Sequence, residues 1–256
     1  MIDLRQGDCL EVMKTLPDNS IDLCLTDPPY GTTACKWDSV IPFEPMWAEL
    51  TRIVKPNGAI CLFGSEPFSS ALRMSNIKMF KYDWVWDRKK ITGFLNAKKR
   101  PLVQHEIVSV FYKKQCLYNP VFHSNKLRRE FKGDSVEGTT TIYGKQKIYK
   151  KNIDVDKSYP RSIIVQTGVV GNSKEKVAHP TQKPVPLLEY LIKTYTLENE
   201  TVLDFTMGSG STGVAAKNLN RKFIGIERDG KYFEIAEGRI EVLKDLIKKA
   251  KDIRNG

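Results

Sequence analysis

Short apolar runs alternate with amphipathic stretches along most of the chain. Compact apolar runs bounded by turn residues predict buried strands, and apolar positions three and four residues apart predict helices. The predicted strands are 2–6, 21–26, 59–63, 80–86, 106–112, 201–205 and 222–227, and the predicted helices are 9–16, 43–54, 67–74, 186–195, 212–219 and 232–249. This alternation predicts an α/β fold whose mainly parallel sheet is covered by helices on both faces.

The pattern stops between residues 115 and 176, a stretch rich in Lys, Arg, Gly, Thr and Tyr. From residue 113 to residue 161, twelve Lys or Arg face five Asp or Glu, which accounts for most of the formal charge of +11. Aromatic residues interleaved with this charge argue against a disordered tract. We expect 1–114 and 177–256 to form one domain, and 115–176 to be an inserted region that contacts nucleic acid or else a solvated loop.

Composition narrows the class of protein further. A chain of 256 residues with 41% hydrophobic content suits one globular core with an insertion. The five cysteines and three histidines are scattered without metal-ligand spacing, so we expect neither a metal site nor a disulfide framework. No apolar run reaches membrane-spanning length, and the first residues lack the apolar segment of a signal peptide. The sequence therefore predicts a cytoplasmic protein, and its excess of positive charge favours nucleic acid as the partner.

An acid and an aromatic residue follow the predicted strand 21–26, in the motif Asp27-Pro28-Pro29-Tyr30. Open α/β sheets bind their ligands at the carboxyl ends of strands. The two prolines fix φ at about −65° and remove two backbone donors, so the carbonyls there face outward. The motif predicts a rigid rim that offers a carboxylate, a carbonyl and a flat ring to a planar ligand bearing an amine.

A second motif, Gly208-Ser209-Gly210-Ser211-Thr212-Gly213, follows the predicted strand 201–205 and opens a helix. Glycines at such a turn let the backbone approach a nucleotide closely. Glu227 ends the next predicted strand, where it can accept hydrogen bonds from ribose hydroxyls. Asp204 directly precedes the turn, where it would repel a pyrophosphate and attract an ammonium group. These features favour S-adenosylmethionine over NAD as the cofactor, with an NAD-dependent dehydrogenase as the alternative.

With the two motifs in this order, the chain resembles the DNA amino-methyltransferases of the beta group, in which the catalytic motif precedes the glycine motif. The resemblance covers nearly the whole chain outside 115–176, and includes Gly7-Asp8-Cys9-Leu10 and the segment from His179 to Pro184. It departs from the family where Thr206-Met207 occupies a turn that usually holds Pro-Phe. The resemblance implies a Rossmann-like methyltransferase fold: a doubly wound sheet with one antiparallel strand and a circularly permuted motif order.

The resemblance also implies a role for each motif residue. Those expected to hold S-adenosylmethionine are Asp204, Gly208, Gly210, Ser211 and Thr212 at the methionine end, Lys183 or Thr181 at its carboxylate, Glu227 at the ribose and Asp8 at the adenine amine. Three of these have plainer alternatives: Asp8 can cap the helix that follows it, Lys183 can be a solvated lysine and Glu227 an ordinary strand-end acid.

By the same resemblance, Asp27 and the Pro28 carbonyl accept the two hydrogens of an exocyclic base amine, and Tyr30 stacks on a base flipped out of double-stranded DNA. An Asp-led motif favours adenine N6, with cytosine N4 as the alternative. A catalytically silent DNA-binding module is a further alternative, against which the intact motifs argue. The candidates for contacts with base edges are Asn125, Arg128, Arg129 and Gln146. The oligomeric state stays open, a homodimer included.

Overall fold

The computed structural model of this chain describes residues 1–32, 38–124, 157–169, 176–177 and 182–241, and the backbone of 138–140 and 144–146. The chain divides into two compact units, one made of Met1–Asn119 with Ser162–Gly256 and the other of Pro120–Arg161. Residues 115–119 and 162–169 belong to the first unit, whereas we expected them in the insertion. The role of the second unit in target recognition stays a prediction.

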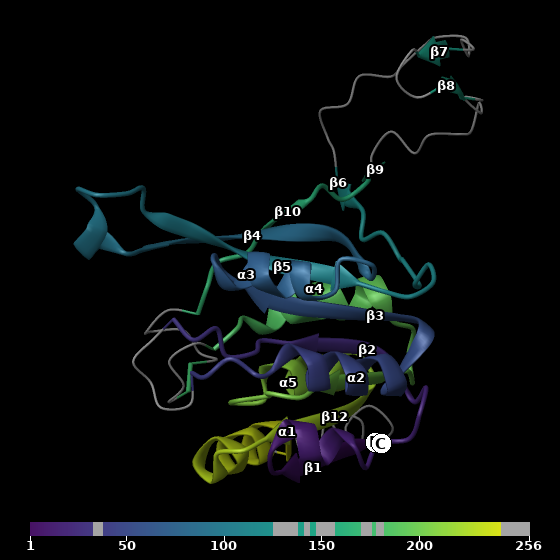
Figure 1. Cartoon of the computed structure of the whole chain (residues 1–256), viewed down its shortest axis with the longest axis vertical. Helices are drawn as coiled ribbons and strands as arrows, with labels where there is room; N and C mark the ends of the chain where they lie inside the picture. The colour runs from purple at the N-terminus through teal and green to yellow at the C-terminus, as the bar shows by residue number, and fades with distance from the viewer. Residues whose placement is uncertain are drawn as a thin grey trace, which may run out of the picture. The chain divides into compact units, whose positions relative to one another are not determined.

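A single large sheet runs through the first unit in the order β1-β12-β11-β2-β3-β5-β4-β10 (Figure 1). Its strands are β1 (Ile2–Gln6), β12 (Lys222–Glu227), β11 (Thr201–Asp204), β2 (Ile21–Thr26), β3 (Val54–Gly64), β5 (Val103–Phe111), β4 (Phe80–Thr92) and β10 (Ile163–Val165). Neighbouring strands are parallel except where β5 pairs with β3 and with β4. The predicted α/β fold with one antiparallel strand is confirmed.

Helices cover both faces of this sheet, as the alternation of side chains in its central strands requires. β2 is buried at every position. Its Leu23 and Leu25 pack in the layer that holds α4 (Val185–Tyr195), α5 (Ser211–Asn218) and the helix over residues 230–241. Cys24 faces the opposite layer, which is built from α1 (Cys9–Met13), α2 (Phe43–Ile53) and α3 (Phe68–Ser75). Alternate residues thus supply two cores.

The centre of the sheet is a topological switch point. β11 lies beside β2, and the chain leaves β11 through α5 on one face but leaves β2 through α2 on the other. Parallel neighbours end at the same edge, so the segments after β2 and β11 lie together there. This is the place where open α/β sheets bind ligands.

Several strands differ from their predicted bounds. β3 begins at Val54, directly after α2, and bulges over Pro56-Asn57-Gly58 because Ile21 pairs with Val54 but Leu23 pairs with Ala59. A Cβ on Gly58 would stand 2.8 Å from the Asp22 carbonyl oxygen, so only glycine fits this approach. β4 and β5 extend past their predicted limits, and the edge strand β10 was not predicted at all.

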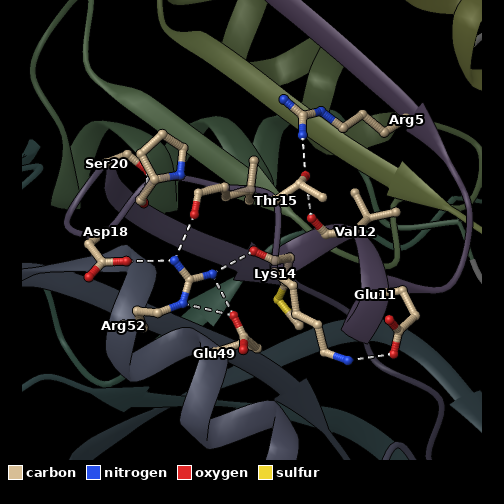
Figure 2. A network of polar contacts seen from close by, with 12 residues as sticks. Arg5, Glu11, Val12, Lys14, Thr15, Asp18, Ser20, Glu49 and Arg52 are labelled. Carbon is tan, nitrogen blue, oxygen red and sulfur yellow. Dashed lines mark hydrogen bonds and ion pairs between the residues drawn. The ribbon is translucent and has the colours of Figure 1, made fainter.

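Helix ends also differ from the predictions. α1 stops at Met13 rather than at residue 16. A side chain from α2 bonds to the last carbonyl of α1 and to a carbonyl of the turn after it. Arg52, at the end of α2, donates to the carbonyls of Met13 and Leu16 at 2.8 and 2.7 Å (Figure 2). It also pairs with Asp18 and Glu49, each at 2.6 Å. One guanidinium therefore joins α1, the turn after it and α2. The predicted helix 232–249 is helical to residue 241, and its remainder lies outside the described residues.

The second unit contains short antiparallel pairs. β6 (His123–Ser124) pairs with β9 (Lys157–Ser158), and β7 (Gly138–Thr140) pairs with β8 (Gly144–Gln146). Beside β6 and β9, the rings of Phe122 and Tyr159 lie 4.9 Å apart between centroids. Of the candidates for base contacts, Asn125, Arg128 and Arg129 lie outside the described residues, as does the side chain of Gln146. Across the described part of the chain, no helix has the length and apolar character needed to cross a membrane, and no acids, histidines or cysteines cluster as metal ligands.

Candidate active site

Both sequence motifs open onto one cavity of about 770 Å³ at the switch point. Asp27 follows the end of β2, and Asp204 ends the neighbouring strand β11. The predicted site residues that line the cavity are Asp8, Asp27, Pro28, Tyr30, Lys183, Asp204, Gly208, Ser211, Thr212 and Glu227. The fold thus brings together side chains that are up to 219 positions apart in the sequence, from Asp8 to Glu227.

The Asp27 carboxylate faces this cavity rather than its own backbone. Its Oδ1 accepts a hydrogen bond from the Tyr30 hydroxyl, and its Oδ2 accepts one from the Lys183 ammonium. Burial raises the pKa of Asp27, the Lys183 charge opposes that rise, and Glu106 adds to it. Each carboxylate oxygen retains a lone pair for a further donor. Among the described residues, no donor reaches the Pro28 carbonyl.

The Tyr30 ring is held on one side by Phe68, with centroids 5.1 Å apart and an interplanar angle of 29°. Its hydroxyl is buried beside Asp27, and burial raises its pKa well above the ordinary value. The Lys183 ammonium lies 5.9 Å from the Tyr30 ring centroid. The ring is therefore fixed in orientation by packing and by one hydrogen bond, as a stacking platform requires.

Lys183 lies at the catalytic end of the cavity, whereas the resemblance implied a place at the cofactor carboxylate. Its ammonium pairs with Asp27 and lies 3.2 Å from Glu106 Oε2, and Glu106 Oε1 accepts from Arg88 at 3.0 Å. Burial lowers the pKa of Lys183, but the charges of Asp27 and Glu106 outweigh it and raise the pKa overall. A row of alternating charges, Arg88-Glu106-Lys183-Asp27, therefore orients the catalytic carboxylate.

Asp204 is a buried carboxylate without a cation beside it in the described part of the chain. It is 3% exposed, and it accepts from the Thr26 hydroxyl at 2.5 Å and the Thr206 amide at 3.2 Å. Burial raises its pKa to about 6, against the hydrogen bonds from Thr212, Thr26 and the Thr206 amide. A negative charge held in so dry a place favours a ligand that brings a positive one.

The glycine turn is held by one acid, by an arginine and by a close packing contact. Glu227 accepts from the Gly208 amide at 2.8 Å and from the Asp229 amide at 2.9 Å, and it still lines the cavity. Gly210 has φ of +76°, and a Cβ there would stand 2.9 Å from Ala236 Cβ. Gly210 therefore packs against the helix over 230–241 and is not among the residues that line the cavity, and its contact with the cofactor stays a prediction. Arg239 from the same helix donates to the Ser209 carbonyl at 2.5 Å.

Asp8 and Thr181 are the remaining residues that were expected to bind the cofactor. Asp8 caps α1, because its Oδ1 accepts from the Leu10 amide at 2.9 Å, and it also lines the cavity. The cap uses only one carboxylate oxygen, so the cap and a contact with an adenine amine are compatible. Thr181 lies outside the described residues.

A pair of hydroxyls connects the two motifs directly. The Thr206 hydroxyl donates to the Asp27 carbonyl at 3.1 Å and lies 2.7 Å from the Thr26 hydroxyl, which donates to Asp204. The departure from Pro-Phe at this turn thus places a hydroxyl between the catalytic loop and the cofactor carboxylate. Sequence reasoning noted Thr206 only as a departure, and it missed Thr26, Glu106, Arg88 and Arg239 because their partners are distant in the sequence.

The residues present fit S-adenosylmethionine by a simple test of charge and space. The cofactor carries an ammonium and a sulfonium, and Asp204 is a buried acid that lacks a cation among the described residues. Glu227 and Asp8 offer carboxylate oxygens along the same cavity wall. The arrangement can hold a cationic nucleoside at one end and a planar amine at Asp27 at the other.

Comparison with known proteins agrees with this arrangement. Residues 21–238 match a family model described as DNA methylase. The chain is 29% identical to the type II methyltransferase M.HinfI of Haemophilus influenzae, over 94% of this chain and 68% of that protein. It is 28% identical to the type II methyltransferase M.HpaI of Haemophilus parainfluenzae, over 92% of this chain and 73% of that protein.

Solved structures give the same result for the fold. The crystal structure of the M1.HpyAVI–SAM complex superposes with a TM-score of 0.61 at 28% identity, over 93% of this chain and all of that one (100%). The PvuII DNA methyltransferase, described as cytosine-N4-specific, superposes with a TM-score of 0.64 at 17% identity, over 92% of this chain and 85% of that one. At this lower identity the second likeness concerns the fold alone.

Proposed function

This chain belongs to the DNA methylase family and is an S-adenosylmethionine-dependent DNA methyltransferase, and we propose that its target is the N6 amine of an adenine flipped out of double-stranded DNA. The observation that carries the proposal is the Asp27 carboxylate, which shares one cavity with the glycine turn and leads a motif that favours adenine in the related family. The bound cofactor supplies an electrophilic methyl group on a sulfonium.

Asp27 and Pro28 make the amine a better nucleophile. The lone pair of an exocyclic amine is delocalised into the ring, and two acceptors on its hydrogens draw the nitrogen towards a tetrahedral geometry. The Asp27 carboxylate and the Pro28 carbonyl are acceptors on the cavity wall. The positive charge that develops on nitrogen is stabilised by the Asp27 carboxylate. After transfer, the nitrogen loses one proton, and Asp27 is placed to receive it because burial raises its pKa.

Orientation supplies a large share of the acceleration. Holding the amine and the methyl donor in line can lower the barrier by ~7–11 kcal/mol. The alternating charges behind Asp27 and the Thr206 bond to its carbonyl fix the catalytic loop in one position. Tyr30, fixed against Phe68, provides a stacking surface for the extruded base, worth roughly 1–3 kcal/mol against an unpairing cost of a few.

The test is transfer of tritiated methyl groups from S-adenosylmethionine to DNA that lacks this modification, followed by hydrolysis to nucleosides. We expect label in N6-methyladenine, with at least a 100-fold lower rate for Asp27→Asn, which keeps shape but loses the charge (roughly 3 kcal/mol). Label in N4-methylcytosine would overturn the choice of base. Equal labelling by the wild type and Asp27→Asn would overturn the role of Asp27, and no labelling by the wild type would favour a silent DNA-binding module.

The second unit, Pro120–Arg161, is proposed to read the DNA sequence, because the surrounding stretch carries most of the net positive charge and phosphate neutralisation dominates DNA affinity. β6 and β9 pair directly, so residues 124–157 can be replaced by a short glycine linker between neighbouring ends. We expect this deletion to retain cofactor binding by calorimetry and to lose sequence-specific methylation. Unchanged methylation at the same sites would contradict this role.

A further inference from the structure

The hairpin formed by β4 and β5 carries exposed apolar side chains at its tip, which we define as residues 93–102. β5 runs against β3 and β4, so β4 is parallel to β2 and ends at the same edge as the active site. Figure 1 shows the hairpin reaching beyond the other strands of the sheet. Phe94 is 74% exposed and Leu95 is 86% exposed, in a 3₁₀ turn over Phe94–Asn96. Two adjacent large apolar residues with this exposure, together at the tip of one hairpin, form a contiguous apolar patch, which is typical of a binding surface.

The tip has a defined conformation. Gly93, with φ of +83°, starts the turn, and the Asn96 and Ala97 amides donate to the carbonyls of Gly93 and Phe94 at 2.9 and 3.0 Å. The amides of Lys99 and Arg100 both donate to the Asn96 carbonyl, at 2.8 and 3.0 Å. The apolar side chains are therefore presented on a hydrogen-bonded turn, which limits the entropy lost when they are covered.

The charge around the tip selects the partner. Residues 88–105 contain six Lys or Arg and no Asp or Glu. Lys89 pairs with Asp87 at 3.6 Å and Arg88 with Glu106, but the structure gives Lys98, Lys99 and Arg100 no ion pair with any described residue. Apolar side chains surrounded by unpaired cations suit a polyanion that also offers an apolar surface. DNA has both, in its phosphates and its stacked bases.

The position of the tip relates it to base extrusion. Arg88, Lys90 and Thr92 on the hairpin stem line the active-site cavity. Phe94 is two residues beyond Thr92, and two residues span at most about 7 Å. A base that enters the cavity leaves a gap in the DNA stack close to the cavity mouth. The stem is also tied to the catalytic acid, through Arg88, Glu106 and Lys183.

We propose that Phe94 and Leu95 enter the DNA stack and occupy the space that the extruded base leaves, while Lys98, Lys99 and Arg100 contact the flanking phosphates. This inference rests on the proposed function, because it concerns how the same site obtains its base. Apolar wedges of this kind hold base steps apart in other DNA-binding proteins. Without the wedge, the unpaired base would return to the stack more readily, and fewer encounters would lead to methylation.

The test compares two short duplexes that carry the target site, once long-read sequencing of methylated DNA has identified it. One duplex is fully paired, and the other has an abasic site opposite the target base, so that little pairing energy opposes extrusion. We expect Phe94→Ser/Leu95→Ser to lower kcat/KM on the paired duplex by about 10- to 100-fold relative to wild type, the size expected from stacking. On the abasic duplex the same variant should stay within about 3-fold of wild type.

Controls separate the possible failures. Met74→Ser and Leu197→Ser remove side chains that are 70% and 53% exposed elsewhere, and they should not change either rate. Lys98→Ser/Lys99→Ser should weaken binding to both duplexes by the same factor and reduce the dependence of that binding on salt concentration. The wedge would be overturned if Phe94→Ser/Leu95→Ser left the rate on the paired duplex unchanged or lowered the rate equally on both duplexes. It would also be overturned if an altered sedimentation coefficient of the variant accounted for the loss. Absence of methylation by the wild type would instead contradict the proposed function.

Discussion

Replacing Asp204 by Asn should weaken cofactor binding and stabilise the free enzyme at the same time. The substitution keeps the shape of the side chain and an acceptor for the Thr26 hydroxyl, but it removes the buried negative charge. That charge is unfavourable in the free protein, where burial raises the pKa of Asp204 from 3.8 to about 6. It becomes favourable once a cationic ligand lies beside it.

The size of both effects follows from that pKa. The folded state binds the Asp204 proton more tightly than the unfolded state, so stability falls as pH rises from about 4 to about 6 and stays lower above that window. A difference of roughly 2 pKa units lowers the free energy of unfolding of the wild type by about 3 kcal/mol at high pH. The neutral Asp204→Asn variant does not suffer this loss. Loss of a charged hydrogen-bond partner should cost about 1.5–3 kcal/mol of cofactor affinity, or roughly 10- to 100-fold in Kd.

Calorimetric titration with S-adenosylmethionine and urea unfolding, each at about pH 5 and about pH 8, measure the two effects. Wild-type affinity should fall roughly tenfold for each pH unit below the Asp204 pKa, whereas the variant should bind weakly at both values. The variant should exceed wild type in stability at the higher pH and match it more closely at the lower one. A variant that binds the cofactor as tightly as wild type, or that is less stable at the higher pH, would refute the assignment of this carboxylate.

Three further outcomes are expected. Lys183→Met removes the charge that lowers the Asp27 pKa, so the acid limb of the single-turnover pH profile should move to higher pH. Glu106→Gln removes a charge that raises this pKa and should move the limb to lower pH. An unmoved limb in both variants would disprove the electrostatic link. Arg52→Met should lower the free energy of unfolding in urea by about 2 kcal/mol because the carbonyls of Met13 and Leu16 lose a charged hydrogen-bond donor. Lys14→Met, which breaks an exposed ion pair, should change it by no more than about 0.5 kcal/mol. Thr206→Val should reduce kcat about tenfold with cofactor Kd unchanged, and Thr206→Ser should restore it; a loss of cofactor binding in the Val variant would argue for a different role.

Elements with strong apolar periods were predictable, and those held by distant partners were not. β2, buried at every position, and α4, with four buried Leu or Ile side chains, are recognisable from the sequence alone. The outer half of β4 is Asp-Arg-Lys-Lys-Ile-Thr and has no strand-like alternation. It is a strand because β5 supplies its partner. The three-residue β10 is likewise specified by pairing with β4 rather than by its own sequence.

The same distinction between local motifs and distant partners holds for the residues of the site. Asp27 and Asp204 were identifiable because each belongs to a short motif at the end of a strand. Lys183 was identified as a site residue, but its ion pair with Asp27 was not, since only the folded chain brings the two together. The motif places Gly210 in the turn, but only the folded chain shows that it packs against Ala236 with a positive φ. A motif locates a residue in a loop, and packing from elsewhere decides which way that residue faces.

The reversed direction of β5 leaves this fold with a freely adjustable part. Strands that run in opposite directions can be joined by a simple turn, while consecutive parallel strands need a longer crossover connection, which is usually a helix that must be packed. The β4–β5 connection can therefore lengthen or shorten without rebuilding a layer, and doubling a flexible connection costs only about 0.6 kcal/mol. Exchange of this one connection between homologues is a route to hybrid enzymes with an intact catalytic pocket and a new way of engaging the double helix.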